Sequence, residues 1–294
     1  MKIEKKLRAK YVACSMILLL SASFALAAVH FLTLDFPRQG VTDTEGTGVN
    51  QSGLIVGRYF TPGRQHGFRY MQGHYQSIDI PGSTSQTDAA WVNSYGDIVG
   101  TYDSNGITHA YVLSHGNVTT IDYPGALVTT GWGISDFGDV VGTEYTTDFF
   151  TAHGYLYHQG TFTSIDDPGA QATWSTMAAD SQHIVGTYYG SDNVYHGFLD
   201  AGGRLSTIDY PNSTFTWITG INSKGAIVGF YNSQDGAQHG FVWSAGKFLS
   251  IDIPGATGTE ANGLDSQGRV VGRYYMQDGS THGYFLPKPT GATQ

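Results

Sequence analysis

The sequence repeats itself six times with almost no drift, and this repeat constrains the fold more than any other feature. Each copy contains the pattern Ile/Leu-Asp-x-Pro, whose aspartates follow one another at intervals of 43 or 44 residues: Asp35, Asp79, Asp122, Asp166, Asp209 and Asp252. Two further patterns, Val-Gly-x-Tyr and His-(Gly/Ala)-aromatic, recur in the same order, although the third copy of the first one is a residue longer. The constant period indicates that the copies share one structure.

Each copy predicts four short strands, which we name a to d; in one copy they fall at residues 220–222, 227–231, 239–243 and 248–253. The Pro-Gly after strand d ends that strand, because proline cannot donate a ladder hydrogen bond. Many glycines (40) and aromatic residues (13%) are typical of a β-protein with tight turns. Four strands in about 40–45 residues is the period of a propeller blade. We therefore predict an all-β, six-bladed β-propeller over residues 30–288, as a single domain.

The phase of the repeat predicts how the ring closes. The first copy begins with a d strand at residues 31–36, and the last copy ends with a c strand at residues 282–286. The N-terminal strand can therefore pair in the last blade, which would protect the edges of the sheets. An open β-solenoid is the alternative, but it would need capping units at both ends, and none is evident. Residues 289–294 are polar and predict a disordered tail.

Residues 1–27 have the features of a secretory signal peptide. A basic segment precedes an apolar run at residues 12–20, and Ala25-Leu26-Ala27 is a cleavage pattern. The run is too short to span a membrane, so we expect a secreted or periplasmic protein without a transmembrane segment. We also expect a monomer. Cleavage near Ala27 would remove Cys14, the single cysteine, and lower the formal net charge from −9 to −13. That charge argues against nucleic acid as a partner, because such binding relies on Lys and Arg.

The third repeated pattern resembles the HAF-type extracellular repeat family of secreted bacterial proteins, which carries a His-Ala-Phe core. The copies here begin at His66, His109, His153, His196, His239 and His282. The ending Ile-Asp-x-Pro-Gly departs from the family's usual one, so the chain resembles a divergent subtype. The resemblance spans all six copies and implies an extracytoplasmic propeller without an assigned activity.

These six histidines could suggest a metal ring, but a residue required in every blade is more simply a structural one. Strand c lies away from the axis of a propeller, so the six imidazoles could not meet. We expect each ring to hydrogen-bond a turn or the aspartate of strand d.

Function is expected where the copies differ. When the copies are aligned on the polar residue that ends strand a, the position five residues earlier holds Glu45, Asp88, Thr130, Ser175, Trp217 and Glu260. Its three acids belong to consecutive blades of a closed ring, and could bind Ca²⁺ or sugar hydroxyls. Aromatic residues mark the opposite arc: Trp132, Trp174 and Trp217, with Phe149 and Phe150. Acids facing aromatic rings are typical of saccharide sites. The alternative is that these are solvated loop acids and packing tryptophans.

Three functions remain open. No G-x-S-x-G, H-E-x-x-H, phosphate loop or dinucleotide pattern occurs, which favours a non-catalytic propeller that binds a glycan or protein at its loop face. The second is a polysaccharide lyase or glycoside hydrolase that uses an acid pair such as Glu45 and Glu260. The third is an inert structural envelope protein. Whether the chain is an enzyme stays open, with the balance against it.

Overall fold

The computed structural model describes residues 30–146 and 151–287, and within them every regular element is a β-strand. No helix in these residues could cross a membrane. The predicted signal peptide, the tail at residues 289–294, and Phe149 and Phe150 lie outside the described residues.

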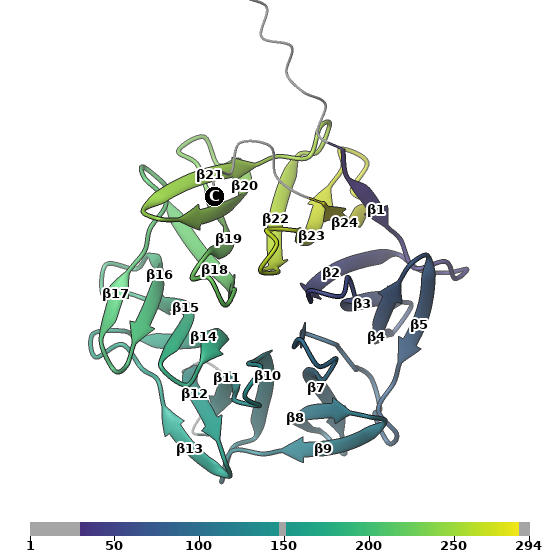
Figure 1. Ribbon diagram of the computed structural model, residues 1–294, viewed down its shortest axis with the longest axis horizontal. Coiled ribbons are helices and arrows are strands. Elements are labelled where there is room, and N and C mark those ends of the chain that lie inside the picture. Colours follow the sequence, from purple (N-terminus) through teal and green to yellow (C-terminus); the bar gives the residue numbers. More distant parts are fainter. Residues whose placement is uncertain (1–29, 147–150, 288–294) are drawn as a thin grey trace, which may run out of the picture.

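The strands follow one another in antiparallel groups of four, arranged around a central axis (Figure 1). The first three groups are β2 (Asp43–Val49), β3 (Ile55–Thr61), β4 (Arg64–Met71) and β5 (His74–Ile78); β6 (Trp91–Val92), β7 (Ile98–Ser104), β8 (Ile107–Ser114) and β9 (Asn117–Ile121); and β10 (Val128–Ile134), β11 (Val140–Tyr145), β12 (His153–His158) and β13 (Thr161–Ser164). The next two are β14 (Ala172–Asp180), β15 (His183–Tyr189), β16 (Tyr195–Ala201) and β17 (Leu205–Thr207); and β18 (Phe215–Ile221), β19 (Ile227–Asn232), β20 (Gln238–Ser244) and β21 (Lys247–Ile251).

The remaining group joins the two ends of the described chain. It consists of β22 (Gly258–Leu264), β23 (Val270–Tyr275), β24 (Thr281–Leu286) and β1 (Leu32–Leu34). Strand β1 pairs antiparallel with β24, with Thr33 opposite Tyr284. The Nδ1 atom of His282 also lies 3.0 Å from Oδ1 of Asp35. Single parallel bridges link some neighbouring groups, so that the strands form sheets of 12, 8 and 4 strands.

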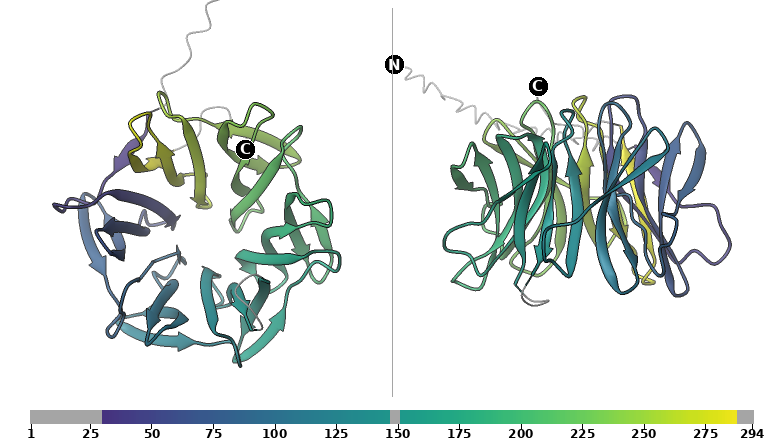
Figure 2. Two further views of the ribbon diagram at one scale, coloured as in Figure 1. Left: turned by 180° about the vertical axis from the view of Figure 1, so that it is seen from behind. Right: turned by 90° about the horizontal axis from the view of Figure 1, so that it is seen from below.

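Most of the first strands lie near the axis, while β5, β9, β13, β17, β21 and β1 lie at the periphery (Figure 1). Seen from the side, the strands run between two opposite faces, where the loops gather (Figure 2). The first strand of each group therefore presents side chains to the axis, and its two ends open onto different faces.

The repeated residues build this arrangement. The aromatic residue of each His-(Gly/Ala)-aromatic pattern is completely buried: Phe68, Tyr111, Tyr155, Phe198, Phe241 and Tyr284. The glycine of Val-Gly-x-Tyr makes room for it, since a Cβ at Gly57 would lie 2.6 Å from the Cε1 atom of Phe68. Burying such a ring removes apolar surface from water, which at about 25 cal/mol per Å² is the main stabilising contribution.

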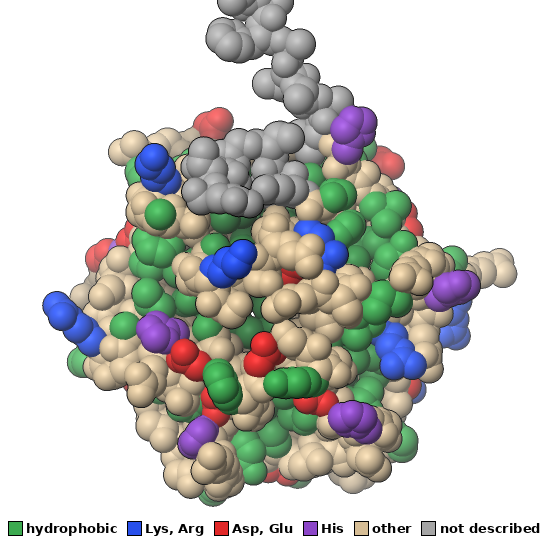
Figure 3. All heavy atoms as spheres, in the orientation of Figure 1, with side chains coloured by type: hydrophobic (Ala, Val, Ile, Leu, Met, Phe, Trp, Pro, Cys, Tyr) green, Lys and Arg blue, Asp and Glu red, His purple; other side chains and the backbone are tan. Residues whose placement is uncertain are grey.

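Each repeated histidine contacts the aspartate of strand d, as the sequence predicted. The distances from Nδ1 to the carboxylate run from 2.6 to 3.2 Å, and the partners are Asp79, Asp122, Asp166, Asp209, Asp252 and Asp35. In most groups the ring also stacks on the tyrosine of Val-Gly-x-Tyr, as His239 does on Tyr231 with centroids 5.1 Å apart. Figure 3 shows the face of the molecule that is turned toward the viewer in Figure 1.

Candidate functional site: a cavity on the central axis

The inner surface is set by one cross-strand pair in each group. One partner lies on the first strand or, for Asp88, shortly before it, and the other is the variable residue of Val-Gly-x-Tyr. Five of the pairs are opposite in the strand register: Glu45 and Arg58, Thr130 and Thr143, Trp174 and Thr187, Trp217 and Phe230, and Glu260 and Arg273. In the group of β6 to β9, Asp88 and Thr101 are joined by two hydrogen bonds of 2.9 and 2.8 Å.

The structure corrects the sequence alignment at one position. Trp174, not Ser175, is equivalent to Glu45 and Trp217. The reason is that β14 has two register shifts, at Ser175/Met177 and at Ala178/Asp180, whereas the other first strands have at most one. The additional shift moves the tryptophan by one residue relative to Asp180.

These pairs divide the inner surface into three sectors. The charged sector contains Glu45–Arg58 and Glu260–Arg273, the small polar sector Asp88–Thr101 and Thr130–Thr143, and the aromatic sector Trp174–Thr187 and Trp217–Phe230. Each sector comes from two neighbouring groups. The three sectors therefore give one axis three chemically different sides.

A cavity of about 390 Å³, which we call the axial cavity, lies among these sectors. It is lined by Glu45, Thr47, Arg58, Ala90, Trp91, Trp132, Trp174, Thr176, Phe215, Trp217, Thr219, Phe230, Glu260, Asn262 and Arg273. Several lining residues sit at β-bulges, where a first strand has one residue more than its partner; Trp132 and Asn262 are examples. A bulge turns a side chain away from the regular alternation, which aims these residues at the axis.

The charged sector is one connected network. Arg58 donates from Nε to Glu45 Oε2 at 2.7 Å, and Nη1 of Arg273 reaches the same oxygen at 3.2 Å. Arg273 also donates from Nε and Nη2 to the two oxygens of Glu260, at 2.7 and 3.0 Å. Tyr275 donates to Glu260 at 2.7 Å. The carboxylates are therefore held in place by charge-assisted hydrogen bonds, which are stronger than neutral ones.

Burial raises the pKa values of Glu45 and Asp88, whereas the nearby guanidinium groups lower them. Burial would raise the pKa of Glu45, but the charges of Arg58 and Arg273 outweigh it and hold that pKa below its ordinary value. Burial raises the pKa of Asp88 to about 6, although Arg58 opposes this shift. The difference follows from geometry: Arg58 donates directly to Glu45, whereas its Nη1 atom is 3.7 Å from Asp88 Oδ2.

The aromatic sector faces this network across the axial cavity. Trp174 and Trp217 are half-buried, and their ring centroids are 5.4 Å apart. Phe215 stacks on Trp217, with ring centroids 6.1 Å apart. Phe230, on the neighbouring strand β19, also stacks on Trp217, with centroids 6.4 Å apart. The Nε1 atom of Trp174 donates to the hydroxyl of Tyr145 at 3.3 Å. The rings form a broad platform whose orientation is fixed by packing.

Trp91 separates the axial cavity from the opposite mouth of the axis, because it lines both. It is only 5% exposed, and a Cβ at Gly220 or Gly263 would lie within 2.9 or 3.1 Å of its ring. Glycine at these equivalent positions therefore leaves room for a single indole across the axis.

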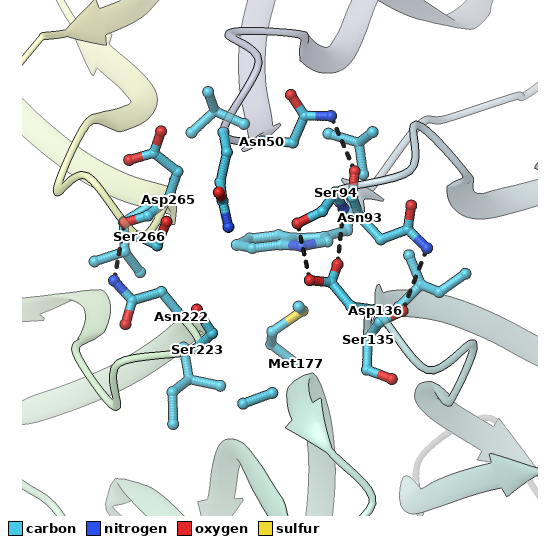
Figure 4. A pocket seen from close by; sticks show the side chains of 18 of the residues that line it. Asn50, Asn93, Ser94, Ser135, Asp136, Met177, Asn222, Ser223, Asp265 and Ser266 are labelled. Carbon is cyan, nitrogen blue, oxygen red and sulfur yellow. Dashed lines mark hydrogen bonds between the residues drawn. The ribbon is translucent and has the colours of Figure 1, made fainter.

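The opposite mouth is built from repeated polar residues, shown in Figure 4. Asn50 donates to the carbonyl of Asn93 at 2.9 Å, Asn93 to that of Ser135 at 3.3 Å, and Asn222 to that of Asp265 at 2.8 Å. Their side-chain oxygens also accept backbone N–H groups of the following turn. We call this set the asparagine girdle; each of its three asparagines ties its own group to the next one.

The predicted site residues divide between two pockets. Glu45, Glu260, Trp132, Trp174 and Trp217 line the axial cavity, so the acidic and aromatic arcs do face one another. Asp88 instead lines a neighbouring pocket of about 350 Å³, which we call the side pocket. It shares Arg58 and Trp132 with the axial cavity.

The calcium site expected at Glu45, Asp88 and Glu260 stays a prediction. No group of three or more His, Cys, Asp or Glu in the described residues could hold a metal ion. Arg58 and Arg273 occupy the positions between the acids and supply the positive charge instead. Sequence reasoning missed these arginines, although a signal was present: they are the only charged residues at the variable position of Val-Gly-x-Tyr.

No protein-family model and no curated protein matches this sequence. Several solved structures are similar. TolB from Acinetobacter baumannii aligns with a TM-score of 0.57 and 12% identity; the alignment covers 79% of this chain and 63% of the TolB chain. A fucose-specific lectin from Aleuria aurantia has a TM-score of 0.53 and 11% identity, covering 86% of this chain and 98% of the lectin. The β-propeller domain of the Trilobed protease from Pyrococcus furiosus has a TM-score of 0.51 and 10% identity, covering 84% and 81%.

This chain has a β-propeller fold. At such low identities the similarity shows the fold alone, so the function of this propeller must be argued from its own residues.

Proposed function

We propose that this protein is a secreted, non-catalytic propeller that binds a glycan in the axial cavity. In this proposal each four-stranded group is one of six blades, and pairing of β1 with β24 closes the ring. We also propose that the chain is related to the HAF-type repeat family. Because such a protein would act outside the cytoplasm, a neutral glycan is a suitable class of ligand.

The observation that carries the proposal is the opposition of two unlike sectors across one cavity. Sugar rings present apolar faces that stack on indoles and hydroxyls that need polar partners. Trp174 and Trp217 offer the first, and the network of Glu45, Arg58 and Arg273 offers the second. A cavity of about 390 Å³ lies within the range of small-ligand sites. Some of the similar structures are lectins, which agrees with this choice of ligand.

The same network argues against glycoside hydrolysis by Glu45 and Glu260. A general acid must hold a proton near neutral pH, so its pKa has to be raised. The pKa of Glu45 is held below its ordinary value, and both acids accept hydrogen bonds from Arg273. They are better placed to orient an arginine or accept a hydroxyl than to transfer a proton.

The test is binding of the purified protein to a glycan array, compared with the variants Trp217→Ala and Trp243→Phe. Trp243 is a matched control, because it is half-buried but does not line the axial cavity. We expect Trp217→Ala to weaken binding at least about tenfold, Trp243→Phe to bind normally, and EDTA to have no effect. Equal binding by Trp217→Ala and the native protein would contradict the proposal, and so would the release of new reducing ends or unsaturated products.

A further inference from the structure

The side pocket exists because the small polar sector fills less space than its counterparts. Trp217 and Phe230 occupy the equivalent cross-strand pair in the aromatic sector, whereas Asp88 and Thr101 occupy it here. The first strand of this group is also short, since β6 contains only Trp91–Val92. The space left over opens beside the axial cavity and is bounded by Arg58 on one side and Trp132 on the other.

The lining of the side pocket is polar but almost free of charge. Apart from Arg58 and Asp88, it consists of Gln65, Gln86, Thr101, Thr108, Val128, Thr130, Trp132 and Tyr145. Amides and hydroxyls of this kind both donate and accept hydrogen bonds. Such a lining fits a ligand with many hydroxyl groups better than a fatty or strongly charged one.

Asp88 provides a buried acceptor in this pocket. It is 4% exposed, and its Oδ1 atom accepts from the backbone N–H of Thr101 at 2.8 Å. Its Oδ2 atom is 3.7 Å from Arg58 Nη1, which is longer than a hydrogen bond. Oδ2 is not one of the fully buried side-chain atoms that lack a partner, and Asp88 lines the side pocket, so a ligand hydroxyl in this pocket could donate to Oδ2. The nearby guanidinium disfavours a cation at the same place.

We propose that the side pocket is a second sugar subsite, so that the ligand is an oligosaccharide of at least two residues. This inference rests on the proposed glycan-binding function. One sugar stacks on Trp174 and Trp217 in the axial cavity, and the next one passes Trp132 and donates a hydroxyl to Asp88. The two pockets share Arg58 and Trp132, which provides the continuity that such a chain requires.

The experiment compares matched sugars by calorimetric titration: L-fucose with Fucα1-6GlcNAc, glucose with cellobiose and maltose, and N-acetylglucosamine with chitobiose. In at least one series, the disaccharide should bind the native protein at least about tenfold more tightly than its monosaccharide. Asp88→Asn keeps the shape and the acceptor for Thr101, and Thr108→Val removes only a hydroxyl. Each should reduce the advantage of the disaccharide severalfold, whereas Trp243→Phe should preserve it.

The outcomes separate the two proposals. If the disaccharide gains nothing over the monosaccharide, or keeps its full gain in both pocket variants, the subsite is wrong and the axial cavity still stands. If Trp217→Ala binds monosaccharides as the native protein does, the proposed function itself fails. Lack of binding to every sugar in the series would count against both. Thermal midpoints of the variants check that each one is folded.

Discussion

The two ends of the central axis are built from different kinds of residue. At one end the asparagine girdle repeats one interaction from group to group, as Asn50 and Asn222 show. At the other end the equivalent cross-strand pairs carry charged, small polar or aromatic side chains. Trp91 lies between them. The difference suggests that repetition serves stability here and that departures from it serve binding.

The largest expected effect concerns the residue that divides the two ends. Trp91→Ala should lower the free energy of unfolding by about 3–5 kcal/mol, because it leaves a cavity where a buried indole contacted the opposite groups. Urea unfolding would measure this. The half-buried Trp132 serves as control, and its alanine variant should cost less. Equal costs for both variants would show that Trp91 is not a structural divider.

The second prediction concerns the cavity end and its pH dependence. The pKa of Asp88 is about 6 in the folded protein, above the ordinary value of 3.8. The native state therefore binds this proton more tightly than the unfolded state, so stability is lost as pH rises from about 4 to 6. A difference of about two pKa units corresponds to about 3 kcal/mol.

Asp88→Asn removes this titration. Relative to the variant, the native protein should lose about 2 kcal/mol of unfolding free energy between pH 4 and pH 7, because part of the effect falls below pH 4. Because the pKa of Glu45 is lowered from 4.5, its ionisation changes the stability mainly below pH 4.5, which lies mostly outside this pH range. Urea unfolding across the range checks the result, and parallel stability curves for the two proteins would contradict the burial argument.

The third prediction concerns the girdle. Asn93→Ala should cost about 1–3 kcal/mol, because the buried amide bonds to the carbonyl of Ser135 and to the backbone of Tyr95 and Asp97. Asn117→Ala is a control at an exposed position and should cost little. Glycan binding by Asn93→Ala should stay close to native, since this end is not the proposed site. A strong loss of binding without loss of stability would reverse the comparison.

The smallest effect is expected for the repeated histidines. His239→Ala should change the unfolding free energy by less than about 1 kcal/mol, because the partly exposed pair with Asp252 is screened by water. The change is measured by urea unfolding at pH 7. A cost comparable to that of Asn93→Ala would mean that the packing of His239 on Tyr231 matters more than its hydrogen bond with Asp252.

Much of the fold could be predicted from the sequence because the same pattern of strands and turns recurs in six copies. The pairing of His239 with Asp252 follows from positions that never vary, and the free d strand at the N-terminus predicted its pairing with β24. In strand b, by contrast, the sequence marks Arg58 and Arg273 only as the charged residues at the variable position, and it does not show that they lie beside Glu45 and Glu260. Arg58 and Arg273 were missed for this reason.

The candidate site was predicted in outline but not in its chemistry. Glu45, Glu260 and the three tryptophans do line one cavity, because their positions on the first strands are equivalent. Ser175 was chosen over Trp174 because a second register shift in β14 cannot be read from the spacing. Asp88 was grouped with the other acids because the sequence does not show that smaller neighbours open a separate pocket around it.

The central claim is that binding occurs where the repeat is broken. A crystal structure of the protein with the tightest-binding glycan tests it most directly. We predict a sugar ring stacked on Trp174 and Trp217 in the axial cavity, with a hydroxyl directed toward the network of Glu45 and Arg273. A glycan bound instead at the repeated histidine and aspartate positions on the outer strands, with the axial cavity empty, would contradict it.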